Sequence, residues 1–307
     1  MARLLAFSIR NRAGALSDSP ITIVFNDVDD DGNTAQFLKD KLSVSCVTLP
    51  RVSQQFHYVN KYTALRALTL ENSEWIVQLD ADTAVINHLN PLLEHLQNPQ
   101  LDFAGVPVLD CPVWRLDRII EKYAGVPRDR IEDSAHPWFP TKYPLFNGGV
   151  TFFRARHLPL FRDEIVPLVE PIRNDMRLGG SSNPLHYLRN LWNRFIEKRQ
   201  SLHSLIIPPY HSKNYADQIA LPILIFKNNL NYHILPHVYN WRSPDANQGE
   251  NIPIRIMHYL HARFPIDRNN LFQPDSPWIM QYRKSTNPGQ NELAKLIDQY
   301  NDWLTNT

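Results

Sequence analysis

Two acidic residues one position apart carry the clearest chemistry in this sequence of 307 residues. Asp80 and Asp82 follow residues 75–79, a short apolar run of the kind that forms a buried strand. Such a strand would deliver both carboxylates to its C-terminal end, where ligands bind in an open α/β sheet. Two carboxylates can hold Mg²⁺ or Mn²⁺, and the ion can in turn neutralise a diphosphate. The alternative is that the acids only cap the next helix or start a turn.

Two basic residues lie on the helix expected just before this strand. Lys61 and Arg66 fall off the apolar face of the helix at 58–68. A cation at either position could pair with a diphosphate, because ammonium and guanidinium groups both bind phosphate oxygens. The alternative is an ordinary solvated helix face.

Polar residues also stand at the edges of two later elements. Asn147 and Gly148 precede a short strand, where glycine allows either a close approach to a ligand or a tight turn. Asp217, followed by Gln218, begins an apolar stretch and is a natural helix N-cap.

The elements that must position these residues alternate along the first ~110 positions. This alternation predicts an α/β fold with a Rossmann-like, mixed, mostly parallel sheet flanked by helices. Past residue 110 the pattern loosens, and a flexible stretch is expected at 170–183. Strands are expected at 21–25, 44–49, 75–79, 103–109, 150–153 and 254–258, and helices at 1–15, 58–68, 89–96, 185–196 and 292–304, while Pro222 should bend or delay any helix at 217–226.

The composition excludes several classes of protein. A net charge of +1 lacks the basic surplus of a nucleic-acid-binding protein, so no nucleic-acid partner is expected. Cys46 and Cys111 have no metal-type spacing, which favours a reducing compartment over a disulfide framework. No apolar run approaches the ~18 residues of a membrane span, and no signal peptide is recognisable. We therefore expect a cytoplasmic protein without a transmembrane segment.

Four separated motifs follow one another along the sequence. They are LDADT at 79–83, FNGGV at 146–150, the Asp217–Gln218 pair with a Leu-Pro stretch that ends at Asn240, and IMHYLHARFP at 256–265. This series resembles glycosyltransferases of the GT-A fold, most of all the glycogenin and lipopolysaccharide galactosyltransferase family. The resemblance spans residues 21 to 265 and implies a GT-A type fold.

The resemblance implies an activity and its partners. The chain would move a sugar from a nucleotide-diphosphate donor to a glycan, lipid-linked glycan or protein acceptor, with retention and with Mn²⁺ or Mg²⁺ as cofactor. His258 would be the third metal ligand beside Asp80 and Asp82, and imidazole suits Mn²⁺ better than Mg²⁺. The alternative for His258 is a satisfied, half-buried histidine.

The resemblance also assigns roles to the remaining candidates. Asn147 and Gly148 would lie against the sugars, Asp217 would contact the donor sugar, and Gln218 would sit near the reacting carbon. The family has a lysine where this chain has Phe264, and Arg263 is the nearest replacement as a phosphate clamp.

The domain organisation is expected to be simple. One domain would comprise a nucleotide-sugar half at 1–109, an acceptor-side half at 110–265 and a C-terminal helical tail at 266–307. The resembling family has a strand ahead of the helix at 1–15, so we expect the strand at 21–25 to lie beside an open position and the base pocket to be shallow.

Three alternatives remain for the function. The first is a non-catalytic protein that binds a sugar nucleotide or glycan on the same fold. The second is an acid-nucleophile phosphatase, which also uses Asp-x-Asp after a strand, although in such enzymes the motif follows the first strand. The third is a nucleotidyltransferase, for which the sequence lacks an N-terminal Gly-rich phosphate loop.

Overall fold

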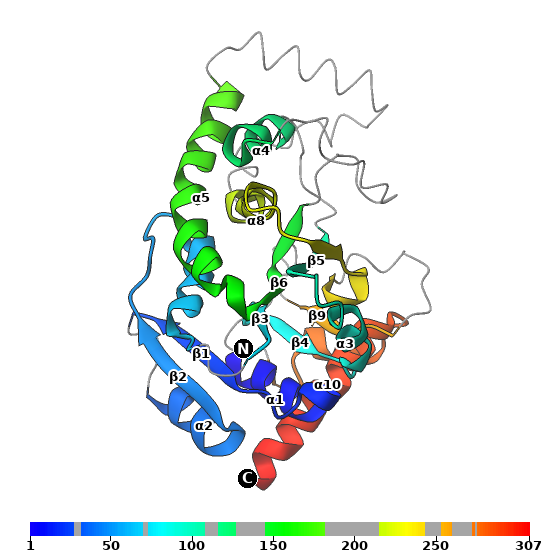
Figure 1. Cartoon of the computed structure of the whole chain (residues 1–307). Coiled ribbons are helices and arrows are strands. Elements are labelled where there is room, and N and C mark those ends of the chain that lie inside the picture. The colour runs from blue at the N-terminus through cyan, green and yellow to red at the C-terminus, as the bar shows by residue number, and fades with distance from the viewer. Residues whose placement is uncertain are drawn as a thin grey trace.

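The computed structural model describes residues 1–27, 32–69, 73–107, 116–126, 145–181, 215–242, 253–259, 272–273 and 275–307. Within these ranges, helices surround a set of short strands (Figure 1). The helices are α1 (Ala2–Arg12), α2 (Asn33–Leu42), α3 (Asn90–Leu96), α4 (Leu116–Ala124), α5 (Leu158–Ser181), α8 (Ala216–Lys227), α9 (Pro277–Arg283) and α10 (Pro288–Asn306), with 3-10 segments that include η2 (His57–Ala67), η4 (Ala155–His157) and η6 (His237–Tyr239).

The strands form three hydrogen-bonded groups. The largest has the order β3 (Trp75–Leu79), β6 (Phe146–Arg154), β5 (Phe103–Pro107), β7 (Tyr232–Ile234). A second joins β1 (Ile21–Asn26) to β2 (Val44–Leu49), and a third has the order β4 (Thr83–Val85), β9 (Ile256–His258), β8 (Trp241–Arg242).

The predicted mixed α/β class is confirmed. Parallel pairing does not predominate among the described strands, because β6 runs antiparallel to both β3 and β5, and β4 runs antiparallel to β9. The parallel pairs are β1 with β2, β5 with β7 and β8 with β9.

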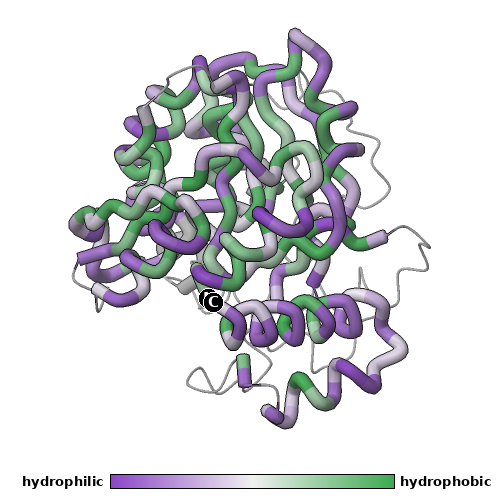
Figure 2. The backbone as a smooth tube through the Cα atoms, turned by 90° about the horizontal axis from the view of Figure 1, so that it is seen from below, coloured by the Kyte–Doolittle hydropathy of each residue, from purple (hydrophilic) through white to green (hydrophobic). Residues whose placement is uncertain are grey.

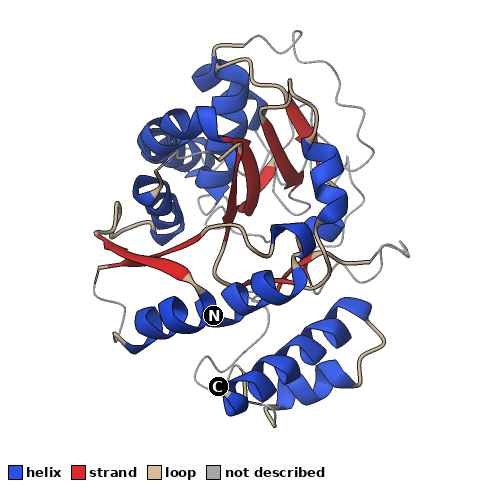
Figure 3. Ribbon diagram, turned by 60° about the horizontal axis from the view of Figure 1, so that its bottom comes forward, coloured by secondary structure: helices blue, strands red, loops and turns tan. Residues whose placement is uncertain are grey.

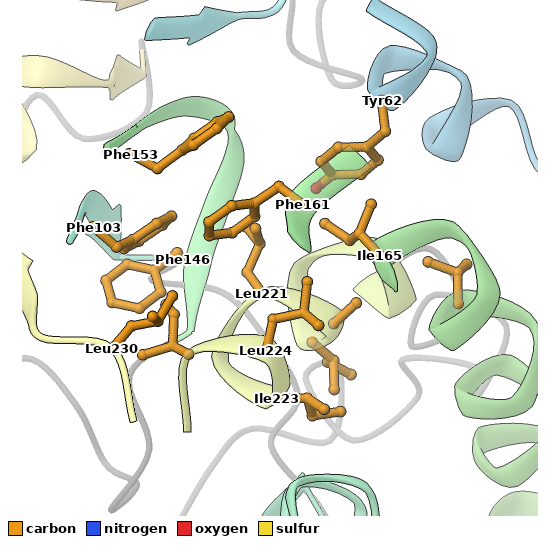
Figure 4. Packing of buried hydrophobic residues seen from close by; sticks show 14 of the residues in the cluster. Tyr62, Phe103, Phe146, Phe153, Phe161, Ile165, Leu221, Ile223, Leu224 and Leu230 are labelled. Carbon is orange, nitrogen blue, oxygen red and sulfur yellow. The ribbon is translucent and has the colours of Figure 1, made fainter. Parts of the chain in front are cut away.

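Helices cover one face of the four-stranded sheet with a large apolar core. In Figure 1, α4, α5 and α8 lie together on one side of β5 and β6. Figure 4 shows Phe103 and Phe146 of the sheet facing Phe161 of α5 and Leu221 of α8. The whole of β6 is buried, because a second core that includes Val150 and Phe152 covers its other face.

The C-terminal helices complete a third core. Helices α9 and α10 lie side by side (Figure 3), and α10 alternates apolar and polar residues along its length (Figure 2). Its apolar face meets α1, where the rings of Phe7 and Tyr300 pack edge to face with centroids 5.3 Å apart. None of the described helices is both long enough and apolar enough to cross a membrane.

Several sequence expectations fail at the level of elements. The stretch at 170–183, expected to be flexible, is helical in α5 up to Ser181, although Pro167 and Pro171 lie inside that helix. Its apolar residues Phe161, Ile165, Val169 and Ile172 recur at helical spacing and are buried in the core, so packing outweighs the two prolines. Likewise, Pro222 does not delay α8, which begins at Ala216. No sequence pattern predicted α2, α4 or β4.

Two expectations concern regions that the structure tests only in part. The expected helix at 185–196 lies outside the described residues. Among the described strands, β1 is hydrogen-bonded to β2 alone, so no described strand occupies the position predicted to be open beside it.

Candidate functional site

A tight turn between β3 and β4 places the two predicted acids. The backbone N–H of Asp80 donates to the carbonyl of Gly149 in β6 at 2.8 Å, which extends the β3–β6 pairing by one residue. Thr83 then closes the turn, because its N–H and its hydroxyl both donate to the carbonyl of Asp80, at 3.0 and 2.7 Å. Asp80 and Asp82 therefore stand at the C-terminal end of β3, as predicted from the sequence.

Strand pairing brings His258 to the same turn from a distant part of the chain. β9 runs antiparallel to β4 with His258 opposite Thr83, and the N–H of Tyr259 donates to the carbonyl of Asp82 at 3.0 Å. As a result, Nε2 of His258 lies 3.0 Å from Oδ2 of Asp82.

The donor atoms of these three residues suit a divalent cation. One ligand atom from each of Asp80, Asp82 and His258 lies within 4.8 Å of the other two. Two carboxylates and one imidazole form a set that Mn²⁺ accepts. Nδ1 of His258 is buried and has no hydrogen-bond partner among the described residues, so the ring has one nitrogen still to be satisfied. The residues present fit a resident metal ion.

Lys61 links this cluster to helix α8. Its Nζ lies 2.9 Å from Oδ2 of Asp217 and 3.7 Å from Oδ2 of Asp80. Asp217, in the first turn of α8, is only 1% exposed. Asp217, a predicted catalytic residue, is thus connected to the metal cluster through two ion pairs, and Lys61 makes both of them.

The two glycines of β6 are needed because side chains of the site lie against them. A Cβ on Gly149 would come within 2.7 Å of Oδ2 of Asp80, and one on Gly148 within 2.8 Å of Nζ of Lys61. Asn147, which is 8% exposed, accepts a hydrogen bond from the N–H of Gly149 at 2.7 Å through its side-chain oxygen. β6 therefore forms one wall of the cluster.

Several buried oxygens near these elements have unused hydrogen-bonding capacity. Most buried polar atoms in proteins have a partner, so orphaned ones indicate a ligand or water position. In the described part of the chain, such oxygens belong to Tyr62 (Oη), Asp217 (Oδ1), Gln218 (Oε1) and Asn240 (Oδ1).

The pKa values of the cluster reflect burial opposed by charge pairing. Burial raises the pKa of Asp80, and the positive charges of Lys61 and His258 offset this only in part. Burial alone would also raise the pKa of Asp82, but the hydrogen bond and charge of His258 outweigh it and lower that pKa. For His258, burial lowers the pKa, while the hydrogen bond and charge of Asp82 and the charge of Asp80 together raise it above 6.5.

The charges in this cluster are unbalanced. Three carboxylates, those of Asp80, Asp82 and Asp217, face two basic groups, those of Lys61 and His258. Burial would lower the pKa of Lys61, but Asp217 and Asp80 raise it, so the lysine stays charged. A divalent cation would supply the positive charge that is still missing.

Not every predicted site residue joins this cluster. Arg66 is exposed at the end of η2, and its charge acts on Asp163 of α5, away from the metal ligands. Arg263 lies outside the described residues. Conversely, the hydroxyl of Tyr62 lies at this cluster although the sequence pattern indicated only that Tyr62 belongs to the apolar face of the helix at 58–68. Its position directly after Lys61 was the one signal in the sequence that could have predicted this.

Comparison with known proteins adds structural likeness only. No protein-family model matches the sequence, and no curated protein sequence matches it. The chain is similar in structure to galactosyltransferase LgtC in complex with donor and acceptor sugar analogs (14% identity, 97% of this chain and 92% of that chain covered, TM-score 0.49). It is also similar to mouse xyloside xylosyltransferase 1 (14% identity, 84% and 90% covered, TM-score 0.44) and to the glycosyltransferase GlyE of Streptococcus pneumoniae (15% identity, 87% and 54% covered, TM-score 0.45). At these identities and TM-scores, the activity of this chain has to be inferred from its own site.

Proposed function

We propose that this chain is a metal-dependent glycosyltransferase that moves a sugar, with retention, from a nucleoside-diphosphate donor to a glycan, lipid-linked glycan or protein acceptor. The observation that supports this most strongly is the convergence of Asp80, Asp82 and His258 at the end of β3, with Asp217 connected to them through Lys61. The four acidic and histidine residues come from the β3–β4 turn, β9 and α8, so they are brought together by the fold and not by local sequence.

Asp80, Asp82 and His258 would hold the ion, and the imidazole favours Mn²⁺ over Mg²⁺. When bound, the metal neutralises the charge of the departing diphosphate and orients it. β6 would form a wall beside the ion, because a Cβ at Gly148 would come within 2.8 Å of Lys61 and one at Gly149 within 2.7 Å of Asp80.

Asp217 would hold the donor sugar. Lys61 occupies Oδ2 of Asp217, while Oδ1 is buried without a partner among the described residues and can accept a hydroxyl. Gln218 follows it on the first turn of α8 with an unpartnered Oε1 and would sit closer to the reacting carbon. In this arrangement Asp217 acts as a hydrogen-bond acceptor that its ion pair with Lys61 holds in place.

A screen of donors tests the proposal. Thermal unfolding is followed with UDP-, GDP-, ADP- and CDP-linked sugars, each with and without Mn²⁺, and release of the nucleotide is measured in separate samples with simple saccharide acceptors. A ligand that binds only the folded state raises the melting temperature. We expect one donor class to stabilise the protein only with Mn²⁺ and to be turned over.

Two variants make the result specific. Asp82→Asn should abolish the Mn²⁺-dependent stabilisation, whereas Asp163→Asn, which removes an exposed surface acid, should leave it unchanged. Stabilisation without nucleotide release over a wide range of acceptors would favour the non-catalytic sugar-nucleotide binder instead. If no donor stabilises the wild type with Mn²⁺, the proposed function is wrong.

A further inference from the structure

The register of the three-stranded sheet places a second cation beside the metal ligands. In the order β4-β9-β8, His258 of β9 is paired with Thr83 of β4 on one side and with Arg242 of β8 on the other. Neighbouring strands lie about 4.8 Å apart, and directly paired residues project from the same face of a sheet. Arg242 is therefore one strand removed from His258.

The packing of the neighbouring residues shows which face this is. Ala84, Met257 and Trp241 form the adjacent row across the same three strands, and all three belong to the core shared with α9 and α10. A Cβ on Gly289 of α10 would come within 2.8 Å of the Trp241 ring, so α10 lies directly on that face. Because side chains alternate along a strand, the row of Thr83, His258 and Arg242 projects from the opposite face, on which His258 meets Asp82.

The charges of the site indicate that a bound diphosphate would need a cation besides the metal, a role that Arg242 can fill. Lys61, the cation first expected to meet a diphosphate, is held between Asp217 and Asp80. The nucleoside diphosphate that departs from the sugar carries more negative charge than one divalent ion neutralises, and the planar guanidinium group of an arginine matches phosphate oxygens.

We propose that Arg242 is a phosphate-binding residue, which contacts the diphosphate of the donor beside the metal. This inference rests on the proposed function, because it needs a metal at Asp80, Asp82 and His258. Arg242 is half-buried and has an interaction of its own within the chain, so the phosphate would share or replace that partner.

Calorimetry with inorganic pyrophosphate tests this without knowledge of the sugar or the base. Mn²⁺ is first titrated into the wild-type protein and into Arg242→Gln, and pyrophosphate is then titrated into each Mn²⁺-loaded protein. Loss of a charge-assisted contact should weaken pyrophosphate binding by about tenfold or more, while the affinity for Mn²⁺ alone should not fall, because removal of a positive charge beside the metal ligands does not weaken cation binding. Arg242→Lys keeps the positive charge but loses the planar guanidinium group, so its affinity for pyrophosphate should be intermediate.

The matched control is Arg255→Gln on the neighbouring segment. Arg255 has the same charge and is half-buried, but its guanidinium donates to the carbonyl of His88 in a solvent-exposed hydrogen bond, so pyrophosphate binding should be unaffected. Equal pyrophosphate affinity in wild type, Arg242→Gln and Arg255→Gln would overturn the inference and leave the metal site standing. If the wild type binds no Mn²⁺ at all, both the inference and the proposed function fail.

Discussion

Lys61 is the residue whose role differs most from the expectation. The sequence suggested a diphosphate partner, whereas the structure places its ammonium group 2.9 Å from Asp217 and 3.7 Å from Asp80. Its charge therefore repels any cation held by Asp80, while its ion pair with Asp217 holds that carboxylate in place. The same lysine is thus expected to weaken metal binding and to support the sugar-binding carboxylate.

Replacing Lys61 by methionine separates these two effects. Removal of a positive charge close to the metal ligands should strengthen Mn²⁺ binding, by roughly tenfold or more for two charges a few ångströms apart. The metal-free variant should unfold at a lower temperature, because the carboxylates of Asp80 and Asp217 lose their counter-charge. Lys227→Met, which breaks an exposed pair with Glu164, is the control for calorimetry and melting. Weaker Mn²⁺ binding in Lys61→Met would show that the lysine supports the metal site.

His258 gives metal binding a defined dependence on pH. Its pKa is raised above 6.5 chiefly because Asp82 and Asp80 outweigh the effect of burial. The imidazole therefore keeps its proton to a higher pH than an ordinary histidine, and a metal has to displace that proton. Mn²⁺ affinity should rise by about tenfold per pH unit until the pH exceeds this raised pKa, and then level off. Calorimetry between about pH 6 and 8 measures it, and a flat profile in the wild type would argue against His258 as a ligand.

At the scale of elements, β6 connects the pieces of the site. Its glycine pair lets the β3 turn, η2 and α8 approach one strand closely. The sequence suggested that these glycines make room for a ligand or a turn. The atoms that a Cβ would meet belong instead to Lys61, Tyr62 and Asp217 at Gly148 and to Asp80, Asn147 and His258 at Gly149. The two glycines therefore make room chiefly for the protein's own side chains.

Gly149→Ala tests this closeness. The added methyl would lie 2.7 Å from Oδ2 of Asp80, so the carboxylate or the strand has to shift. We expect Mn²⁺ affinity to fall by about tenfold or more, with a fall in stability of roughly 1–3 kcal/mol from overpacking. Calorimetry and thermal unfolding measure the two effects separately. Wild-type Mn²⁺ affinity in this variant would mean that Asp80 does not hold the metal from its position beside β6.

Some elements were predictable from the sequence because their signals are local. β1, β2, β3 and β5 are short apolar or β-branched runs, and α10 has a clear helical period, so each was expected close to its observed bounds. α5 was missed because its prolines argue against a helix, and only the packing of Phe161 and Ile165 in the core outweighs them. The antiparallel course of β6 was not predictable either, since strand direction depends on how distant segments meet.

At the scale of the whole molecule, the site forms where three cores meet. The β3 strand belongs to the four-stranded sheet, while β4 and β9 pack against the core of α1, α9 and α10. The turn that carries Asp80 and Asp82 joins these parts. Motif order in the sequence predicted the grouping of Asp80, Asp82 and His258, because the resemblance covered all three. It could not predict the chain of contacts from Asp80 through Lys61 to Asp217, or the register of Arg242, because both depend on tertiary packing.

The central claim is that these three side chains hold one divalent ion. Diffraction from crystals soaked in Mn²⁺, recorded where manganese scatters anomalously, tests it most directly. The account predicts a single strong peak within coordination distance of carboxylate oxygens of Asp80 and Asp82 and of a ring nitrogen of His258. The peak should be absent in Asp82→Asn crystals. A Mn²⁺ peak elsewhere with none between these residues, or an unchanged peak in the variant, would contradict the account.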